Sequence, residues 1–407
     1  MNKKIFKKNV FAFLLVCLIV FAVISVGQGA KNAIVSGSVD FQYDSFKLFS
    51  MRINPYDETL APTNVSKDLN LTKYYDRLEA NQFPSFLAIM TPLAIFPPYV
   101  ANIIWCISNL ALTAFMLILL RKLLCPEMPS KIYIAISCLM LMGLGWRNSV
   151  GMGQHTIFSM FFFVLAMYLS QNKKSVAAGI MLAISFFKYT LTVPLAIYFV
   201  YKRKFKELII SVIIHIALTI FSAFWLRESI INLILKPLKI TSWLGNEGYI
   251  DFGAVLNLEG SSSLIITVTL MLAFLIVAVF ISKEKTDNFF SNGDFLSLLC
   301  YLSMVIVYHR AYDFFVWIVP CMIYMYSYYT TKQQKFELIA SAILFVYSNF
   351  LSRALFGLCS IFPQISNYVF LSDIILAILT NAFIIYLAVK IIKKLSKKQH
   401  NQPKITN

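Results

Sequence analysis

Charged residues are scarce in this sequence: they make up 14% of 407 residues, whereas hydrophobic residues make up 59%. Glycine and proline are also few, with 14 and 13 residues. A soluble domain of this size needs a larger polar surface, so the composition excludes a soluble globular protein. The sequence therefore predicts an all-α, polytopic membrane protein.

The sequence also lacks the short motifs of soluble enzymes. It contains no Walker loop, no His-Glu-x-x-His and no Gly-x-Ser-x-Gly. Its seven cysteines lie in or beside apolar runs, and none forms a close pair with ligand spacing. We therefore expect no nucleotide-dependent reaction in the cytoplasm, no disulfide framework, no metal and no cofactor.

About twelve apolar runs are long enough, or apolar enough, to lie in a bilayer. The first follows a lysine-rich start, an order that also fits a secretory signal peptide, but its length favours a retained transmembrane helix. The runs are 10–28, 99–120, 132–146, 156–169, 176–187, 190–201, 208–226, 263–282, 295–308, 314–329, 338–351 and 369–392.

The net charge of +17 is distributed in a way that indicates topology. With a cytoplasmic N-terminus and twelve crossings, the cytoplasmic segments hold most of the basic residues and the exported segments are close to neutral. This positive-inside pattern explains the charge without a nucleic-acid partner. We predict one transmembrane domain over 1–392 with a large exported loop at 29–98, a basic cytoplasmic tail at 393–407, and both termini in the cytoplasm.

Two segments do not fit simple crossings. Runs 176–187 and 190–201 are each too short to cross a hydrocarbon core of about 30 Å, and they meet at Phe-Phe-Lys-Tyr-Thr. We expect half-depth helices that hold Lys188 in or near a cavity. Segment 81–98 contains several prolines and predicts an interfacial or re-entrant helix.

The predicted topology places the unusual polar residues on the exported side. Each has a local explanation: a solvated loop carboxylate, an ion pair between helix ends, a lysine that reaches the interface, or a helix cap. None of these explanations predicts that all lie on one side, which favours a shared polar cavity. The residues are Asp40, Asp44, Arg147, Gln154, His155, Lys188, His309, Arg310 and Asp313.

A carboxylate that accepts a proton, beside cations that hold an anion, suits transfer of a group away from a phosphate. Several blocks, in order, resemble glycosyltransferase family 87, the polyprenyl-phosphate-mannose-dependent mannosyltransferases of the GT-C class. The blocks are VDFQYDSFKLF with INPY, FPSFLAIMTPLAIFP followed by Trp105, GMGQHTIFSMFFFVLAMYL, AAGIMLAISFFKYTLTVPL and YHRAYDFFVWIVP.

The resemblance implies a GT-C enzyme in the cell membrane with its active site on the exported face. It would move a sugar, mannose by analogy, from a polyprenyl-phosphate donor to a lipid or glycan acceptor, with inversion. Asp40 would be the general base, with Asp44 as the alternative, and Lys188, His309 and Arg310 would be phosphate and cavity ligands. Gln154, His155, Arg147 and Asp313 are further candidates for substrate binding.

Two other functions remain open from the sequence. A transporter or flippase of a lipid-linked saccharide would also need a one-sided cavity and broken helices, but no inverted repeat is evident. A polymerase or ligase of surface polysaccharide would be expected to carry several arginines or a catalytic histidine in one large exported loop. Loop 227–262 holds one arginine and no histidine, which makes this function less favoured.

Overall fold

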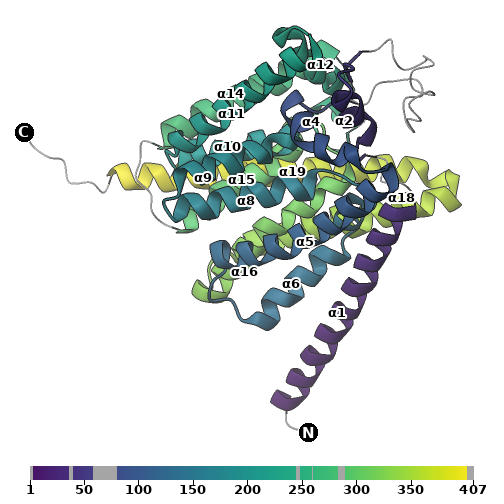
Figure 1. The fold of residues 1–407 in the computed structure, drawn as a ribbon. Coiled ribbons are helices and arrows are strands. Elements are labelled where there is room, and N and C mark those ends of the chain that lie inside the picture. The colour runs from purple at the N-terminus through teal and green to yellow at the C-terminus, as the bar shows by residue number, and fades with distance from the viewer. Residues whose placement is uncertain are drawn as a thin grey trace, which may run out of the picture.

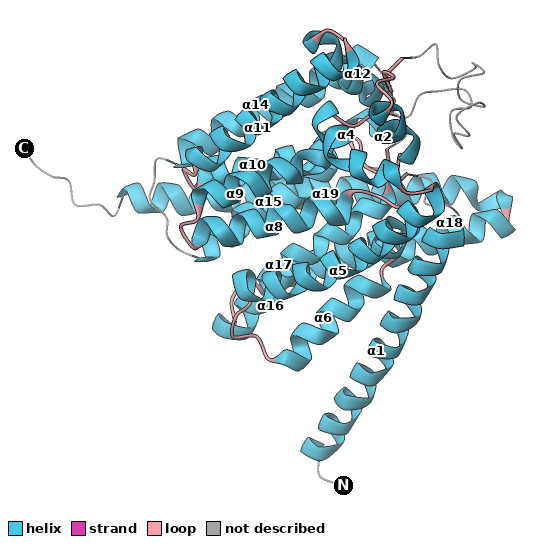
Figure 2. Cartoon of the chain, in the orientation of Figure 1, coloured by secondary structure: helices cyan, strands magenta, loops and turns pink. Residues whose placement is uncertain are grey.

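The computed structural model describes residues 3–35, 40–57, 80–243, 248–258, 260–282 and 289–400. Every regular element in these ranges is a helix, as predicted (Figure 2). The elements are α1 (Lys3–Val35), α2 (Tyr43–Ser50), α4 (Pro84–Met90), η2 (Thr91–Ile95), α5 (Pro98–Leu124), α6 (Ser130–Met142), α7 (Leu144–Gly151), α8 (Thr156–Gln171), α9 (Ser175–Ser185), η3 (Phe186–Lys188), α10 (Tyr189–Tyr201), α11 (Phe205–Leu226), α12 (Ile230–Trp243), α13 (Phe252–Val255), α14 (Gly260–Ser282), α15 (Phe289–Ile306), η5 (Ala311–Trp317), α16 (Ile318–Thr331), α17 (Lys335–Val346), η6 (Tyr347–Leu351), α18 (Ser352–Ile361), η7 (Pro363–Ile365) and α19 (Ser366–His400).

The long helices form a bundle, and short helices cover one of its ends (Figure 1). Helices α2, α4 and α12 lie at that end, whereas the C-terminal end of α19 lies at the other. Helix α1 leans away from the bundle, and its apolar side chains are exposed: Phe13 is 68% and Val23 is 65% accessible. An apolar exterior of this kind is what contact with lipid hydrocarbon requires.

Six described helical runs are long and apolar enough to cross a membrane, or seven if the bent pair α7 and α8 is one span. The predicted number of twelve crossings is not confirmed, because several helices are short and breaks interrupt others. The angle between α7 and α8 is 109°. The six runs are Asn9–Val35, Pro98–Leu124, Ser175–Tyr201, Phe205–Leu226, Gly260–Phe280 and Tyr368–Lys394.

One of these runs, Ser175–Tyr201, folds back on itself. Helix α9 begins beside the start of α11, where a Cβ on Gly179 would lie 2.9 Å from the Glu207 carbonyl oxygen. Helix α10 ends just before α11 begins, so both outer ends lie at the same end of the bundle. The end of α8 also lies there, because Ser170 Oγ donates to Glu207 Oε1 at 2.8 Å. The turn η3 instead lies near the start of α8, where the Lys188 amide donates to Ser159 Oγ at 2.9 Å. The run is therefore a hairpin of two short helices that meet at Lys188; the lengths of its apolar parts predicted the short helices but not the hairpin.

The prolines of segment 81–98 fall at helix starts. Pro84 opens α4 and Pro98 opens α5, positions where a missing N–H costs no hydrogen bond. The segment thus forms the short pair α4 and η2 before α5. Its depth in a membrane stays a prediction.

The predicted boundaries of the first loop and the tail fall partly on residues outside the described ranges. In the predicted exported loop 29–98, these are residues 36–39 and 58–79. Helix α19 continues to His400, so the predicted tail at 393–407 begins inside a helix. Residues 401–407 of this tail lie outside the described residues.

Candidate active site

An aromatic cluster fixes the segment that carries Asp40. Phe41 is buried and stacks on Trp105 at 5.2 Å between ring centroids. The Trp105 indole N–H donates to the Gly153 carbonyl at 2.8 Å, and the Asp40 amide donates to the Met152 carbonyl at 2.8 Å. Gln42 then takes a left-handed conformation, with φ 58°, that turns the chain into α2. Asp40 is therefore held against the link between α7 and α8.

Gln154 lies in that link and connects Asp40 with Lys188. Its amide nitrogen donates to Asp40 Oδ2 at 2.5 Å, and its amide oxygen accepts from Lys188 Nζ at 3.1 Å. The carboxylate and the ammonium are thus separated by one side-chain amide, although they are far apart in sequence. Gln154 is 7% exposed, so this bridge is shielded from bulk water.

Lys188 makes two more contacts with its ammonium group. Nζ donates to Thr156 Oγ1 at 2.8 Å and to Asp313 Oδ1 at 2.7 Å, and the Thr156 hydroxyl also donates to Asp313. Asp313 is 1% exposed. Because an ammonium has three hydrogens, all of them are used. A new anion at Lys188 must therefore replace one of these partners.

Tyr312 lies close to several of these charges. Lys188 Nζ is 4.8 Å from the centroid of its ring. Burial, with the nearby carboxylates of Asp40 and Asp313, raises the pKa of the Tyr312 phenol well above its usual value. The phenol therefore stays protonated at neutral pH and can donate a hydrogen bond.

His309 is fully buried beside the cluster and has an assignable tautomer. Nδ1 is 2.8 Å from the Val307 carbonyl oxygen, which can only accept, so Nδ1 carries the proton. Burial lowers the pKa of His309 to about 4, and the Lys188 charge acts in the same direction while Asp313 opposes it. Nε2 is then a lone-pair acceptor, and it has no hydrogen-bond partner among the described residues.

His155 is also buried, at 1% exposure, but it packs in the aromatic cluster. Its ring lies 4.5 Å from that of Phe86 and 5.4 Å from that of Trp105 between centroids. Nδ1 is 3.4 Å from the Gln82 side-chain nitrogen. His155 therefore belongs to the aromatic cluster that packs against the segment of Asp40.

The remaining predicted site residues are Arg310, Asp44 and Arg147. Arg310 directly precedes η5 and follows His309, and its Nε donates to the Tyr308 hydroxyl at 2.5 Å. Asp44 is buried in the first turn of α2, where burial of Tyr43, and then the charge of Asp44, raises the pKa of the Tyr43 phenol.

Arg147 turns away from the cluster. Its Nη1 donates to Gln28 Oε1 at 2.8 Å, which ties α7 to α1. The structure therefore groups Asp40, Gln154, Lys188 and Asp313, and it separates Arg147 from them.

Sequence reasoning missed Asp251, which lies in the short stretch before α13. Its Oδ1 accepts from the Ala254 amide at 3.1 Å and caps that helix, and its carboxylate also interacts with the His309 backbone N–H. Burial raises the pKa of Asp251 to about 6. A lone aspartate in an otherwise unmarked loop gives no signal of this contact in the sequence. Thr156 and Tyr312 could have been proposed from the sequence, because each is next to a predicted site residue.

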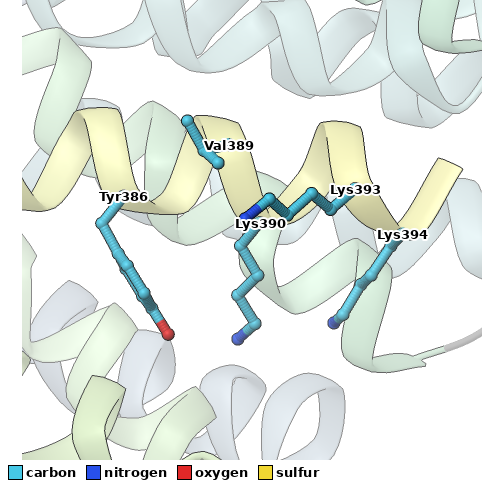
Figure 3. Close-up of a pocket in the computed structure, with 5 residues that line it drawn as sticks. All are labelled: Tyr386, Val389, Lys390, Lys393 and Lys394. Atoms are coloured by element: carbon cyan, nitrogen blue, oxygen red, sulfur yellow. The ribbon is translucent and has the colours of Figure 1, made fainter. Parts of the chain in front are cut away.

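A second charged cluster joins α15, α17 and α19 near the C-terminal end of α19. Asp294, which is 0% exposed, accepts from Lys390 at 3.1 Å and from Lys394 at 2.6 Å. Glu337 accepts from Lys390 at 2.5 Å and from the Tyr386 hydroxyl at 2.8 Å. Tyr386, Lys390 and Lys394 point in the same direction from α19 (Figure 3). Asp294 lies near the start of α15 and the Lys188 cluster near its end, so the two clusters are about 20 Å apart along that helix.

The fold and the Lys188 cluster define a multi-pass membrane protein with a carboxylate and an ammonium group brought together at one end of the bundle. Residues 84–308, more than half of the chain, match glycosyltransferase family 87. The chain belongs to this family and is a membrane glycosyltransferase. No curated protein and no solved structure matches the chain.

The matched region contains some site residues and not others. Gln154, His155, Lys188 and Arg147 lie inside it. Asp40 and Asp44 precede it, and His309, Arg310 and Asp313 follow its last residue directly or closely. The roles of the residues on either side therefore depend on the geometry and not on the match.

Proposed function

We propose that the protein transfers a sugar, mannose first among the candidates, from a polyprenyl-phosphate donor to a lipid or glycan acceptor at the exported face. In this reaction the acceptor oxygen bonds to the anomeric carbon as the bond from that carbon to the phosphate oxygen breaks. The acceptor hydroxyl gives its proton to Asp40, and the bonding electrons leave with the phosphate. One displacement of this kind inverts the anomeric carbon.

The observation that carries the proposal is the Gln154 bridge. A base and a leaving-group cation must lie on opposite sides of one reacting carbon, close enough to act on it together. Gln154 holds the Asp40 carboxylate at 2.5 Å and the Lys188 ammonium at 3.1 Å through the two ends of its amide. This link connects the Asp40 carboxylate to Lys188, which makes Asp40 the preferred base and Asp44 the alternative.

Lys188 binds the donor phosphate in this proposal by exchanging one neutral partner. Thr156 and Gln154 are uncharged, so replacing either of them with a phosphate oxygen gains a charge-assisted hydrogen bond. Asp313 stays in place and keeps the ammonium oriented. Arg310, at the start of η5, supplies the second positive charge near the donor.

His309 has a different role from that of a phosphate ligand. A neutral imidazole with its proton on Nδ1 presents a lone pair at Nε2, and a lone pair repels an anionic oxygen. We assign this atom to a hydroxyl of the transferred sugar or of the acceptor. Such a contact rejects a substrate that lacks the hydroxyl, because the buried nitrogen is then left unpaired.

The test is donor consumption by the purified protein. Polyprenyl-phosphate mannose and, separately, other polyprenyl-phosphate sugars are incubated with a lipid acceptor extract, and released polyprenyl phosphate is measured. Wild type should consume one donor, Lys188→Met should lose most of that rate, and the matched variant Lys47→Met should keep it. Lys47 lies on α2, where its Nζ donates to the Ala94 carbonyl. Movement of an intact donor across vesicles without its cleavage would instead identify a flippase.

A further inference from the structure

A groove lies between α5 and α6, far from the Lys188 cluster. Its lining includes Leu117 and Arg121 on α5, whereas Trp105, which contacts the His155 ring, lies about 20 Å earlier along the same helix. The groove has a volume of about 700 Å³. Binding sites for small molecules commonly enclose about 300–1,000 Å³. It is therefore large enough to hold a ligand of its own.

The walls of the groove are mostly hydrocarbon. Leu117 and Ile118 line one side, and Ile134 and Leu141 line the other. The Tyr133 hydroxyl donates across the groove to the Leu117 carbonyl, and α16 contacts both α5 and α6. An apolar channel of this kind between two membrane helices fits an extended hydrocarbon chain.

The end of the groove nearest the connection between α5 and α6 is positively charged. Arg121 and Lys122 line it, and no carboxylate among the described residues lines it or pairs with either cation. Arg121 Nη2 donates to Ser130 Oγ at 2.9 Å, and its guanidinium lies 5.4 Å from the Tyr133 ring centroid. A guanidinium has five N–H donors, so most of them are available to an anion.

We propose that this groove binds an anionic phospholipid, with an acyl chain between α5 and α6 and the phosphate at Arg121 and Lys122. A free phosphate would leave the apolar walls uncovered, and a zwitterionic phospholipid would bring its own ammonium group close to the two cations. An anionic phospholipid satisfies both features in one molecule, and basic pockets between membrane helices favour such headgroups. The site is separate from sugar transfer and does not depend on the proposed reaction.

The experiment measures lipids retained by the purified full-length protein. Wild type in detergent is titrated with phosphatidylglycerol or with phosphatidylcholine of the same chains, and bound lipid is counted by native mass spectrometry. Wild type should hold phosphatidylglycerol about tenfold or more tightly than phosphatidylcholine, because each basic residue near a headgroup contributes to the attraction. Arg121→Gln with Lys122→Gln should remove that preference.

Two further variants make the result specific. Lys173→Gln with Lys174→Gln removes two cations from the connection between α8 and α9, outside the groove, and should leave the preference unchanged. Ile134→Trp fills the groove from an exposed position and should weaken phosphatidylglycerol binding even if the Arg121 variant does not fold.

The proposal fails if wild type does not prefer phosphatidylglycerol, or if the Arg121 and Lys122 variant retains the preference. It also fails if millimolar inorganic phosphate displaces the lipid completely, since that result identifies an anion site without a chain site.

Discussion

Replacing Asp40 by asparagine tests the proposed base while preserving its shape. Asp40 Oδ2 accepts from the Gln154 amide at 2.5 Å, and an asparagine oxygen at the same place can accept the same hydrogen bond. The amide cannot accept the acceptor proton as a carboxylate does. We expect turnover to fall by about 10²–10⁴, the range typical of a lost general base, which is about 3–5 kcal/mol of activation free energy.

Folding and donor binding should change little in Asp40→Asn. The backbone bond from Asp40 to Met152 and the stacking of Phe41 on Trp105 do not involve the carboxylate. The thermal midpoint and the donor concentration for half-maximal rate should therefore stay close to those of wild type. The assay is the initial rate of polyprenyl-phosphate release at saturating donor, with a single-turnover measurement to isolate the chemical step.

Two other carboxylates of the same segment serve as comparisons. Asp44→Asn should have a milder effect, and Asp57→Asn, in the turn beyond α2, should leave turnover unchanged. If Asp44→Asn loses activity and Asp40→Asn does not, the base is Asp44. If Asp40→Asn retains turnover within about threefold of wild type, and Asp44→Asn does too, the proposed mechanism is wrong.

The remaining predictions concern other parts of the chain. Lys188→Met should raise the half-saturating donor concentration and lower turnover, and Arg at this position should restore part of both in the same kinetic assay. Asp294→Ala leaves two lysines without their buried partner, so the unfolding free energy should fall by about 3 kcal/mol in a detergent melt while donor specificity stays unchanged. Because the folded-state pKa of Asp251 is raised to about 6, its contribution to the unfolding free energy should fall as pH rises from about 4 to 6. Asp251→Asn should then gain stability over wild type at pH 7, by up to about 3 kcal/mol, and show no gain near pH 4. Reporter tags should indicate cytoplasm after Lys173 and the exported side near Gly248; the opposite result at Gly248 would contradict the predicted sidedness.

Local patterns in the sequence predicted those features of the fold that depend on nearby residues. The lengths of two apolar runs around Lys188 predicted two short helices that meet there, and the prolines of 81–98 predicted a separate short helical segment before α5. The number of crossings depends on how apolar runs are divided by bends. Composition does not show a bend such as the 109° angle between α7 and α8.

The sequence predicted which residues belong to the candidate site better than it predicted which contacts they make with one another. Gln154 and Lys188 were expected on one side, but the bridge to Asp40 joins residues 114 positions apart and depends on how Phe41 packs on Trp105. Arg147 was expected in the same cavity, yet the packing of α7 on α1 directs it to Gln28. Side-chain direction at a helix end is set by tertiary contacts, which a single sequence does not display.

The Lys188 cluster and the second charged cluster differ in how readily they could accept a phosphate. In the second cluster two carboxylates face two lysines, and a phosphate would have to replace an anion there. At Lys188, by contrast, two of the three partners are neutral.

In the proposed reaction the total charge of the site stays constant while one negative charge moves. Asp40 becomes neutral as it takes the proton, and the leaving phosphate gains the charge that Asp40 loses. Gln154 lies between these positions with its N–H toward Asp40 and its oxygen toward Lys188. As the charge moves to the phosphate, its attraction to Lys188 and Arg310 grows. These two cations therefore stabilise the transition state more than the bound donor, which is the condition for catalysis.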